Sequence, residues 1–417
     1  MPEATEVPSA VAADLQDERL IQHSGIGGSI TAFRNRIKSG DLGSLPVIIG
    51  LVVIWIVFQL INPTFLSSIN LVNLTLQCAA IGTIAIGVVL VLLLGEIDLS
   101  VGSVSGLSSA ILAVGFVTLG WPLVVAIAAS VVTGVLIGLL YGFLFTRFGV
   151  PSFVITLAGL LGFLGLQLWV LGATGSINIP FDSWIVQFAQ QWFLPAWLSY
   201  VIVVLAVLAY GAQLLVTSRA RNKAELSAKS MTSIIVRCVG LLLLLGIPAW
   251  YLNQARGIGM MFLFFLVLVV VMNFFLTRTK WGRSVFAVGG NVEAARRAGI
   301  RVNRVYISVF ILCSTFAAVG GILAAARLAA ANQGSGGGDT NLNAIAAAVI
   351  GGASLFGGRG SAFSALLGIL VIQSISSGLT LMNLDSSIRY MVTGAVLLLA
   401  VIVDSLSRRT RVSHGRA

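Results

Sequence analysis

Long apolar runs separated by short polar breaks make up most of this chain. Each run is about 17–25 residues long, the length that a helix needs to cross roughly 30 Å of hydrocarbon. The runs lack the ten-residue alternation typical of barrel strands in membranes. The pattern predicts about twelve spanning helices, or ten if the glycine-interrupted pair near residue 357 does not span. The twelve candidate spans are 45–61, 70–94, 99–118, 122–145, 152–172, 197–217, 231–253, 259–277, 305–330, 341–357, 361–381 and 388–404.

Composition supports the same interpretation. Hydrophobic residues make up 58% of the chain and charged residues only 9%, against roughly 25% charged residues in an ordinary soluble domain. A soluble fold of this length could not cover its surface with so few charges. In hydrocarbon every backbone N–H and C=O must be paired internally, which leaves helices or closed barrels. The predicted fold class is therefore all-α, a polytopic transmembrane helical bundle.

The charge distribution predicts how the bundle is oriented. Residues 1–44 hold acidic and basic residues but no apolar run, so they read as a poorly ordered cytoplasmic tail and not as a cleavable signal peptide. Alternating sides from there places most lysines and arginines in the cytoplasm, which predicts an even number of spans with both termini inside. The membrane domain then covers 45–407, and 408–417 form a second cytoplasmic tail. The net charge of +11 is explained by this bias, so no nucleic-acid partner is expected.

Motifs for catalysis are missing from the sequence. It contains no GxxxxGK[ST], HExxH or GxSxG, and its two histidines, His23 and His414, lie in the tails. Its three cysteines lie singly in separate apolar runs without metal-ligand spacing. We therefore expect no catalytic residue, no metal and no cofactor, and a transport role within a lipid membrane. The energy would come from an ion gradient or from another subunit.

Two polar breaks interrupt the apolar helices and are candidates for the translocation path. The first contains Glu96, Asp98, Ser100 and Gly102. Acids near the bilayer are costly and usually face a cavity or a partner. The alternative is a cytoplasmic turn in which Asp98 caps the first turn of the next helix.

The second break runs over 351–361, is rich in glycine, and contains Ser354 and Ser361. Small residues here let helices approach closely or let the backbone break. Both breaks read as an apolar helix, a polar glycine-punctuated segment, then Gly-Ser and another apolar helix. This similarity hints at an internal repeat, a common source of the central pathway in transporters.

The longest internal cytoplasmic segment, 278–304, predicts a docking element. Glu293, Ala294, Ala295 and Arg296 form a short helix-favouring stretch, and Gly299 is a suitable C-terminal cap. An ordered charged helix between spans is more than a linker needs, so docking to a soluble partner is the favoured interpretation. The alternative is a charged loop that only fixes topology.

Four stretches carry a resemblance to a known family. They are GEIDLSVGSVSGL at 95–107, VPSFVITLAGLLGFLG at 150–165, AVGGNVEAARRAGI at 287–300 and AIAAAVIGGASLFGGRGS at 344–361. The chain resembles the permeases of bacterial ATP-binding-cassette (ABC) sugar importers, in the branch that handles ribose, galactose, arabinose and xylose. The match covers about 45–407. QARGIGM at 254–260 and an extra hairpin with a basic loop around 200–255 look most like the D-xylose permeases.

The resemblance implies a multi-pass protein of the bacterial cytoplasmic membrane. It would form a homodimer around a central pathway, with a separate ATP-hydrolysing subunit on the cytoplasmic face and an extracytoplasmic sugar-binding protein. The loop with Glu293, Ala294, Ala295 and Gly299 would be the coupling helix. It departs from the family pattern, since Ile307 and Ser308 stand where the wider consensus has Leu-Pro.

The expected cargo is a monosaccharide, D-xylose first, with ribose, galactose, a related furanose or an autoinducer as alternatives. A different class of transporter stays open as well. It is an ion-coupled secondary sugar transporter in which Glu96 and Asp98 handle the ion.

Overall fold

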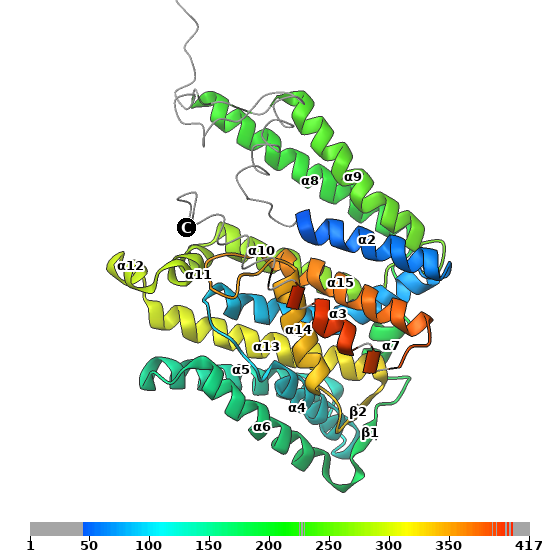
Figure 1. Cartoon of the computed structure of the whole chain (residues 1–417), viewed down its shortest axis with the longest axis vertical. Coiled ribbons are helices and arrows are strands. Elements are labelled where there is room, and N and C mark those ends of the chain that lie inside the picture. The colour runs from blue at the N-terminus through cyan, green and yellow to red at the C-terminus, as the bar shows by residue number, and fades with distance from the viewer. Residues whose placement is uncertain are drawn as a thin grey trace, which may run out of the picture. The chain divides into compact units, whose positions relative to one another are not determined.

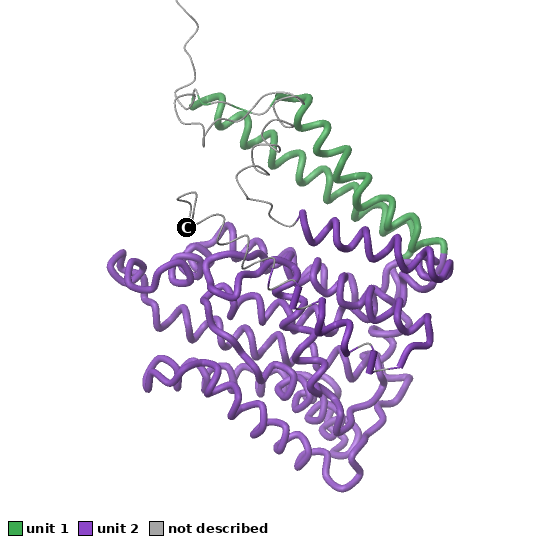
Figure 2. Tube along the Cα trace, viewed as in Figure 1, with its two compact units in different colours: residues 1–42, 195–254, 410–417 green, residues 43–194, 255–409 purple. Residues whose placement is uncertain are grey.

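The computed structural model describes residues 45–402 apart from 225, 227, 229, 386, 389, 397, 400 and 401. The tails expected at 1–44 and 408–417 lie outside the described residues. The chain divides into two compact units (Figure 2). The described part of the first unit is Pro195–Gln254, and the second unit joins Gly43–Leu194 to Ala255–Arg409.

The all-helical fold class is confirmed. In the described part of the chain, nine helices are long and apolar enough to cross a membrane, and α2 is a further apolar helix of 17 residues. The long helices and α2 are α2 Leu45–Ile61, α3 Ser68–Leu93, α4 Val101–Ala113 continued by the π-helical turn η2 Val114–Thr118, α5 Leu123–Phe148, α6 Ser152–Leu171, α8 Ala196–Lys223, α9 Met231–Leu252, α10 Met260–Arg278, α13 Val302–Leu328 and α15 Ala362–Leu381. The shorter elements are η3 Gly172–Thr174, α7 Trp184–Gln190, α11 Lys280–Gly290, α12 Val292–Arg297, α14 Gly338–Ile350 and the antiparallel strands β1 Ser176–Asn178 and β2 Ala330–Asn332.

One expected span is too short to cross the membrane. A span was expected over 341–357, but α14 has 13 residues and ends at Ile350. At 1.5 Å per residue it is about 20 Å long, short of the roughly 30 Å of hydrocarbon. Gly352 follows with φ +99°, a conformation that suits glycine and takes the chain out of the helix. The expected span at 388–404 falls only partly on described residues, and those that are described, 388, 390–396, 398, 399 and 402, are all helical.

Helix α3 forms the centre of the second unit (Figure 1), and 19 of its 26 residues are buried. It packs antiparallel to α13, with Gly87 against Cys313 and Gly320 against Ile84. Small residues at these crossings let the two backbones approach closely. Helices α4 and α5 pack against α13, and α10, α14 and α15 pack against α3.

The outer helices of the second unit carry the lipid-facing surface. Leu161 on α6 is 66% exposed and Val132 on α5 is 53% exposed. Their neighbours on α2, α5 and α6 include many more exposed large apolar side chains. So large an apolar surface is stable in lipid and would aggregate in water.

The first unit is a two-helix hairpin, as expected around 200–255. Helix α8 packs against α9, where Gly211 lies beside the Cys238 thiol, and the Asn253 amide donates to Ser199 Oγ at 3.3 Å. The side chains along both helices are mostly exposed. The connecting loop is only partly described.

Candidate functional site

The chain re-enters the bundle after α3 through the first polar break. Helix α3 ends at Leu93, and Gly95, with φ +77°, turns the chain back. Asp98 then lies beside Cys313, and Ser109 beside Gly321, so α4 runs in the same direction as α13. Cys313 is residue 12 of the 27 in α13 (302 to 313 inclusive). Helix α4 therefore starts near the middle of the bundle.

Asp98 is the centre of a buried hydrogen-bond network. Its side chain is 2% exposed. Oδ1 accepts from the Ser100 amide at 2.8 Å and from Ser100 Oγ at 2.7 Å, and Oδ2 accepts from the Cys313 thiol at 3.6 Å. Tyr141 Oη donates to Ser100 Oγ at 2.7 Å. These bonds satisfy a carboxyl that would be costly inside an apolar bundle.

The alternative role for Asp98, capping the next helix, is wrong. In that role Asp98 would accept hydrogen bonds from the N–H groups of the first turn of α4. Its partners are instead Ser100, which precedes that turn, and Cys313 from another helix. Ser100 occupies the N-cap position of α4 without a capping side-chain bond.

Helix α6 forms hydrogen bonds with two further residues of the first break, Glu96 and Leu99. Ser152 Oγ donates to Glu96 Oε2 at 2.6 Å, and Thr156 Oγ1 accepts from the Leu99 amide at 3.1 Å. Glu96 is half-buried. Burial raises the pKa of the Glu96 carboxyl above its ordinary value, while the bond from Ser152 acts in the opposite direction.

Gly102, the last candidate in this break, makes a tight backbone contact. It lies against the Gly336 carbonyl and Asn341, so a side chain at 102 would displace the segment before α14. Asn341 is 7% exposed and donates from Nδ2 to the Leu99 carbonyl at 2.8 Å. The first break is thus tied to the start of the short helix α14.

The second break lies against the end of α3. The Gly358 amide donates to the Leu93 carbonyl at 2.9 Å. Ser354 Oγ accepts from the Phe356 amide at 3.2 Å, and Ser361 forms a reciprocal capping box with Ser364 at the start of α15. Both serines are half-buried. The fold brings the two breaks together at Leu93, while these two serines make local bonds.

The short helix expected around Glu293 is present as α12. Asn291 caps it by accepting from the Ala294 amide at 2.9 Å, and Gly299 follows it with φ +81°. Glu293 and Arg296 form an exposed ion pair of 2.7 Å. Ala295 alone among the α12 residues is buried, so the helix lies on the bundle by one face and exposes the rest.

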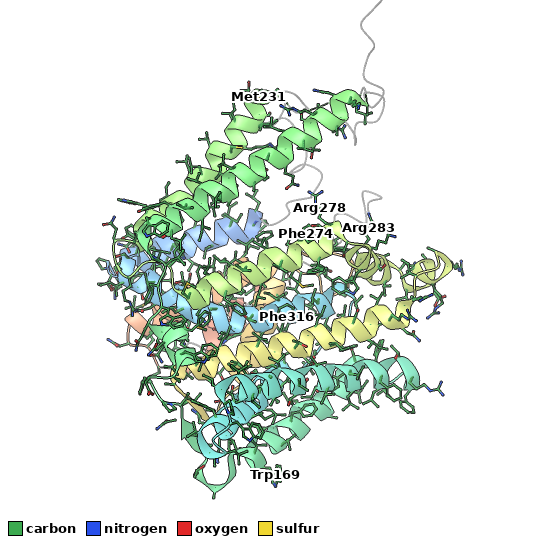
Figure 3. All side chains as sticks on the ribbon, turned by 180° about the vertical axis from the view of Figure 1, so that it is seen from behind. Trp169, Met231, Phe274, Arg278, Arg283 and Phe316 are labelled. Atoms are coloured by element: carbon green, nitrogen blue, oxygen red, sulfur yellow. The ribbon has the colours of Figure 1, made fainter. Side chains whose placement is uncertain are left out.

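Basic side chains surround α12. Figure 3 shows Arg278 and Arg283 at the end of the second unit that carries α12, and Trp169 at the opposite end, near the C-terminus of α6. Arg278 and Arg283 are exposed, as are Arg296 and Arg297. We refer to the end that carries α11 and α12 as the α12 end, and to the opposite one as the β1–β2 end (Figure 1).

A glycine contact connects α11, the helix before α12, to both breaks. Gly289, in the last turn of α11, lies against the Leu93 carbonyl and the Gly358 amide. Gly357 in turn lies against the Gly289 carbonyl and Gly95. The sequence contains the glycine pairs, but a single sequence gives no sign that positions 95, 289 and 357 meet.

A polar segment outside both breaks also joins this region. Residues 332–343, NQGSGGGDTNLN, connect β2 to α14 and form its first turns. Gln167 Nε2 donates to the Asn332 and Ser335 carbonyls at 3.1 and 2.9 Å. The sequence predicts only a connection between two spans over 331–340. The local signal for a further role is a dense polar composition with no lysine or arginine.

Comparison with known proteins places these features in a family. A family model described as "Branched-chain amino acid transport system / permease component" matches residues 70–401. The xylose transport system permease protein XylH of Escherichia coli K12 is 36% identical over 375 residues, 89% of this chain and 94% of that protein. XylH of Haemophilus influenzae is 33% identical, over 90% of this chain and 99% of that protein.

A ribose permease is similar as well. The ribose import permease protein RbsC of Bacillus subtilis is 31% identical over 365 residues, which cover 88% of this chain and 94% of that protein. No solved structure matches the chain significantly.

Proposed function

Because this chain belongs to the family of branched-chain amino acid transport system permease components, and within it resembles the ABC sugar permeases of the xylose and ribose type, we propose that it imports D-xylose by alternating access. Its transport role and its place as a multi-pass protein of the bacterial cytoplasmic membrane follow from the family. The proposal adds the cargo, a separate ATP-hydrolysing subunit, an extracytoplasmic binding protein and a homodimeric permease.

The exposed helix α12 is the observation that carries this proposal. An isolated ion pair on a helix of six residues gives little stability. The helix is nevertheless capped at both ends and held by Ala295, while Glu293, Ala294, Arg296 and Gly299 are exposed. A rigid, charged protrusion of this kind fits a cleft in a soluble subunit. In the proposed orientation the α12 end and both termini are cytoplasmic, which agrees with the basic residues around α12.

The contacts of α12 and α11 suggest how docking would act on the path. Closure of the ATP-hydrolysing subunits would move α12, and Gly289 at the end of α11 would pass that movement to Leu93 and Gly358. Leu93 ends α3 just before the first break, and Gly358 lies within the second. We propose that these two breaks shape the translocation path. The residues concerned are Glu96, Asp98, Ser100, Gly102, Ser354 and Ser361, of which Asp98 and Ser100 act from buried positions inside the protein.

The cargo assignment rests on similarity. The XylH proteins are more similar to this chain than the RbsC proteins are, by 36% identity against 31%. Ribose, galactose and related sugars are the alternatives. Uptake of labelled D-xylose by the assembled transporter, measured against competing unlabelled sugars, tests the cargo. Stronger competition by ribose or galactose than by unlabelled D-xylose would reassign it.

Reconstitution in liposomes tests the energy source. With the partner ATPase and the loaded binding protein, the chain should accumulate sugar only when ATP is supplied on the α12 side. The chain alone should accumulate none under an imposed proton or sodium gradient. Gradient-driven accumulation without an ATPase would overturn the proposal and favour an ion-coupled transporter that uses Glu96 and Asp98.

A further inference from the structure

The segment that leads into α14 exposes polar groups on the surface of the single chain. Gln333, Gly334, Gly338 and Asp339 are all exposed. Asp339 Oδ2 accepts a hydrogen bond of 3.3 Å from Tyr390 Oη, whose side chain is 59% exposed. A carboxylate and a phenol thus lie together on an otherwise strongly apolar surface, and the exposed Gln333 side chain in the same segment lies against Gly175.

Contacts with α4 fix the depth of this segment. Gly336, with φ +68°, lies against the Gly102 carbonyl and the Gly106 amide, and Asn341 bonds the Leu99 carbonyl. These α4 residues directly follow Asp98, which lies beside Cys313 near the middle of α13. Asp339 stands between Gly336 and Asn341 in the chain. It is therefore near the middle of the bundle, where hydrocarbon would surround an outward-facing residue.

Lipid is an unsuitable neighbour for this surface, for two separate reasons. Non-helical backbone at membrane depth occurs only where protein covers it or where it lines a water-filled cavity. The backbone of 335–337, which lies against α4, is non-helical and partly exposed. An ionisable side chain at this depth likewise faces a cavity or the interior of an assembly. The surface must be covered by something polar.

We propose that Gln333, Asp339 and Tyr390 line the sugar path in the assembled permease. This inference rests on the proposed function and adds residues that neither break contains. The Asp339 carboxylate and the Gln333 amide oxygen accept hydrogen bonds from sugar hydroxyls, and the Gln333 amide and Tyr390 hydroxyl donate to them. A polyhydroxylated monosaccharide fits this mixture, and affinity stays low because the groups are few and open to water.

A two-fold homodimer agrees with this assignment. If this face turns toward the two-fold axis, each Asp339 faces its copy on the other protomer. Two carboxylates in a dry contact would repel, since like charges in a low dielectric are strongly destabilising. A hydrated path between them removes that conflict. Dry burial of the face against a second copy is therefore the outcome that the test must separate from the proposal.

Thiol accessibility in the assembled, membrane-embedded transporter tests the assignment. The native thiols Cys78 and Cys313 are buried and Cys238 is half-buried, so Cys238→Ala gives a quiet background. Asp339→Cys is treated with a membrane-impermeant, charged methanethiosulfonate reagent. Leu161→Cys is the matched control, because Leu161 is 66% exposed and its neighbour Leu160 accepts from Ser103 Oγ at the depth of the Gly102 contact.

Asp339→Cys should react about a hundredfold faster than Leu161→Cys, the factor by which insertion scales disfavour a charge at the bilayer centre. Modification should block sugar uptake in the first variant and leave it intact in the second. Reaction of Asp339→Cys as slow as that of the control would overturn the proposal, whether lipid or a dry protein contact covers the site. The labelling needs neither ATP nor sugar, so it is independent of a failure of ATP-driven uptake in the unmodified transporter.

Discussion

The thiol of Cys313 on α13 donates a hydrogen bond to Oδ2 of Asp98, with 3.6 Å between sulfur and oxygen. The two residues are 215 positions apart in the chain. The bond fixes the start of α4 against the middle of α13, and with it the re-entrant course of the first break. A buried carboxyl therefore has a structural task here that does not require it to touch the substrate.

Removing the Asp98 side chain should destabilise the protein. In Asp98→Ala, the Ser100 amide and hydroxyl lose their acceptor inside the bundle, and a buried unsatisfied donor costs about 1–3 kcal/mol. Asp98→Asn keeps an acceptor oxygen for Ser100 and should lose less. The melting temperature of the detergent-purified chain, followed by size-exclusion chromatography after heating, measures both. Equal melting temperatures for Asp98→Ala and the unmodified chain would contradict this structural role.

Changes on α12 should affect coupling and leave the fold intact. Glu293→Ala removes an exposed ion pair, which is worth about 0–1 kcal/mol, so membrane insertion and melting temperature should hardly change. The variant should lose most sugar uptake because the ATP-hydrolysing subunit no longer docks correctly. Co-purification of that subunit and uptake in proteoliposomes are the two measurements.

Gly299→Ala should also lose sugar uptake, since the φ of +81° at position 299 disfavours a side chain. Normal uptake in both variants would remove α12 from the mechanism.

Two adjacent glycines allow a sharper test of the connection between α12 and the path. A Cβ at position 289 would collide with the Leu93 carbonyl, whereas a Cβ at 290 would meet nothing within 4 Å. Gly289→Ala should therefore displace α11 from the two breaks, and Gly290→Ala should be silent. We expect Gly289→Ala to assemble with the ATPase and hydrolyse ATP, but with uptake reduced about tenfold or more, as a misplacement of 1 Å can cause in a geometry-dependent step.

The outcome of this pair separates transmission from folding. Retained ATP hydrolysis with lost uptake in Gly289→Ala indicates uncoupling at the glycine contact. Loss of the protein from the membrane would show that the position is needed for folding only. Equal uptake by Gly289→Ala and Gly290→Ala would show that this contact does not carry the movement.

Local patterns predicted most of the helices of the bundle, because a segment that crosses lipid must be a continuous apolar helix of sufficient length. The ranges predicted for α2, α3, α5 and α13 therefore agree with the structure to within a few residues. The rule fails for α14, where apolar length suggested a full span. There the glycines at 351 and 352 end the helix early, and protein contacts replace the lipid that a span would face.

The candidate site could be predicted only in part. The α12 helix was recognisable because its charges and Gly299, its expected C-terminal cap, are local signals. The contact of Gly102 with Gly336 and that of Gly289 with Leu93 were not, since each joins segments that are distant in the chain. The Asp98 network depends on Cys313 and Tyr141, two residues that look like ordinary packing residues in an apolar run.

Close helix packing gives a last test, through one matched pair of glycines. Gly138 on α5 lies against the backbone of Phe310 and Ile311 on α13, so a Cβ there has no room and the two helices would have to separate. Gly162 on α6 has nothing within 4 Å of its Cβ position. Gly138→Ala should lower the free energy of unfolding by about 1–3 kcal/mol, the usual cost of overpacking. Gly162→Ala should be neutral or slightly stabilising, because alanine favours the helix by about 1 kcal/mol in water-based scales.

Melting temperatures of the two purified variants, compared in one detergent, decide the point. A loss in Gly162→Ala as large as that in Gly138→Ala would mean that α6 is covered by another surface, such as a second copy of the chain, and is not free in lipid.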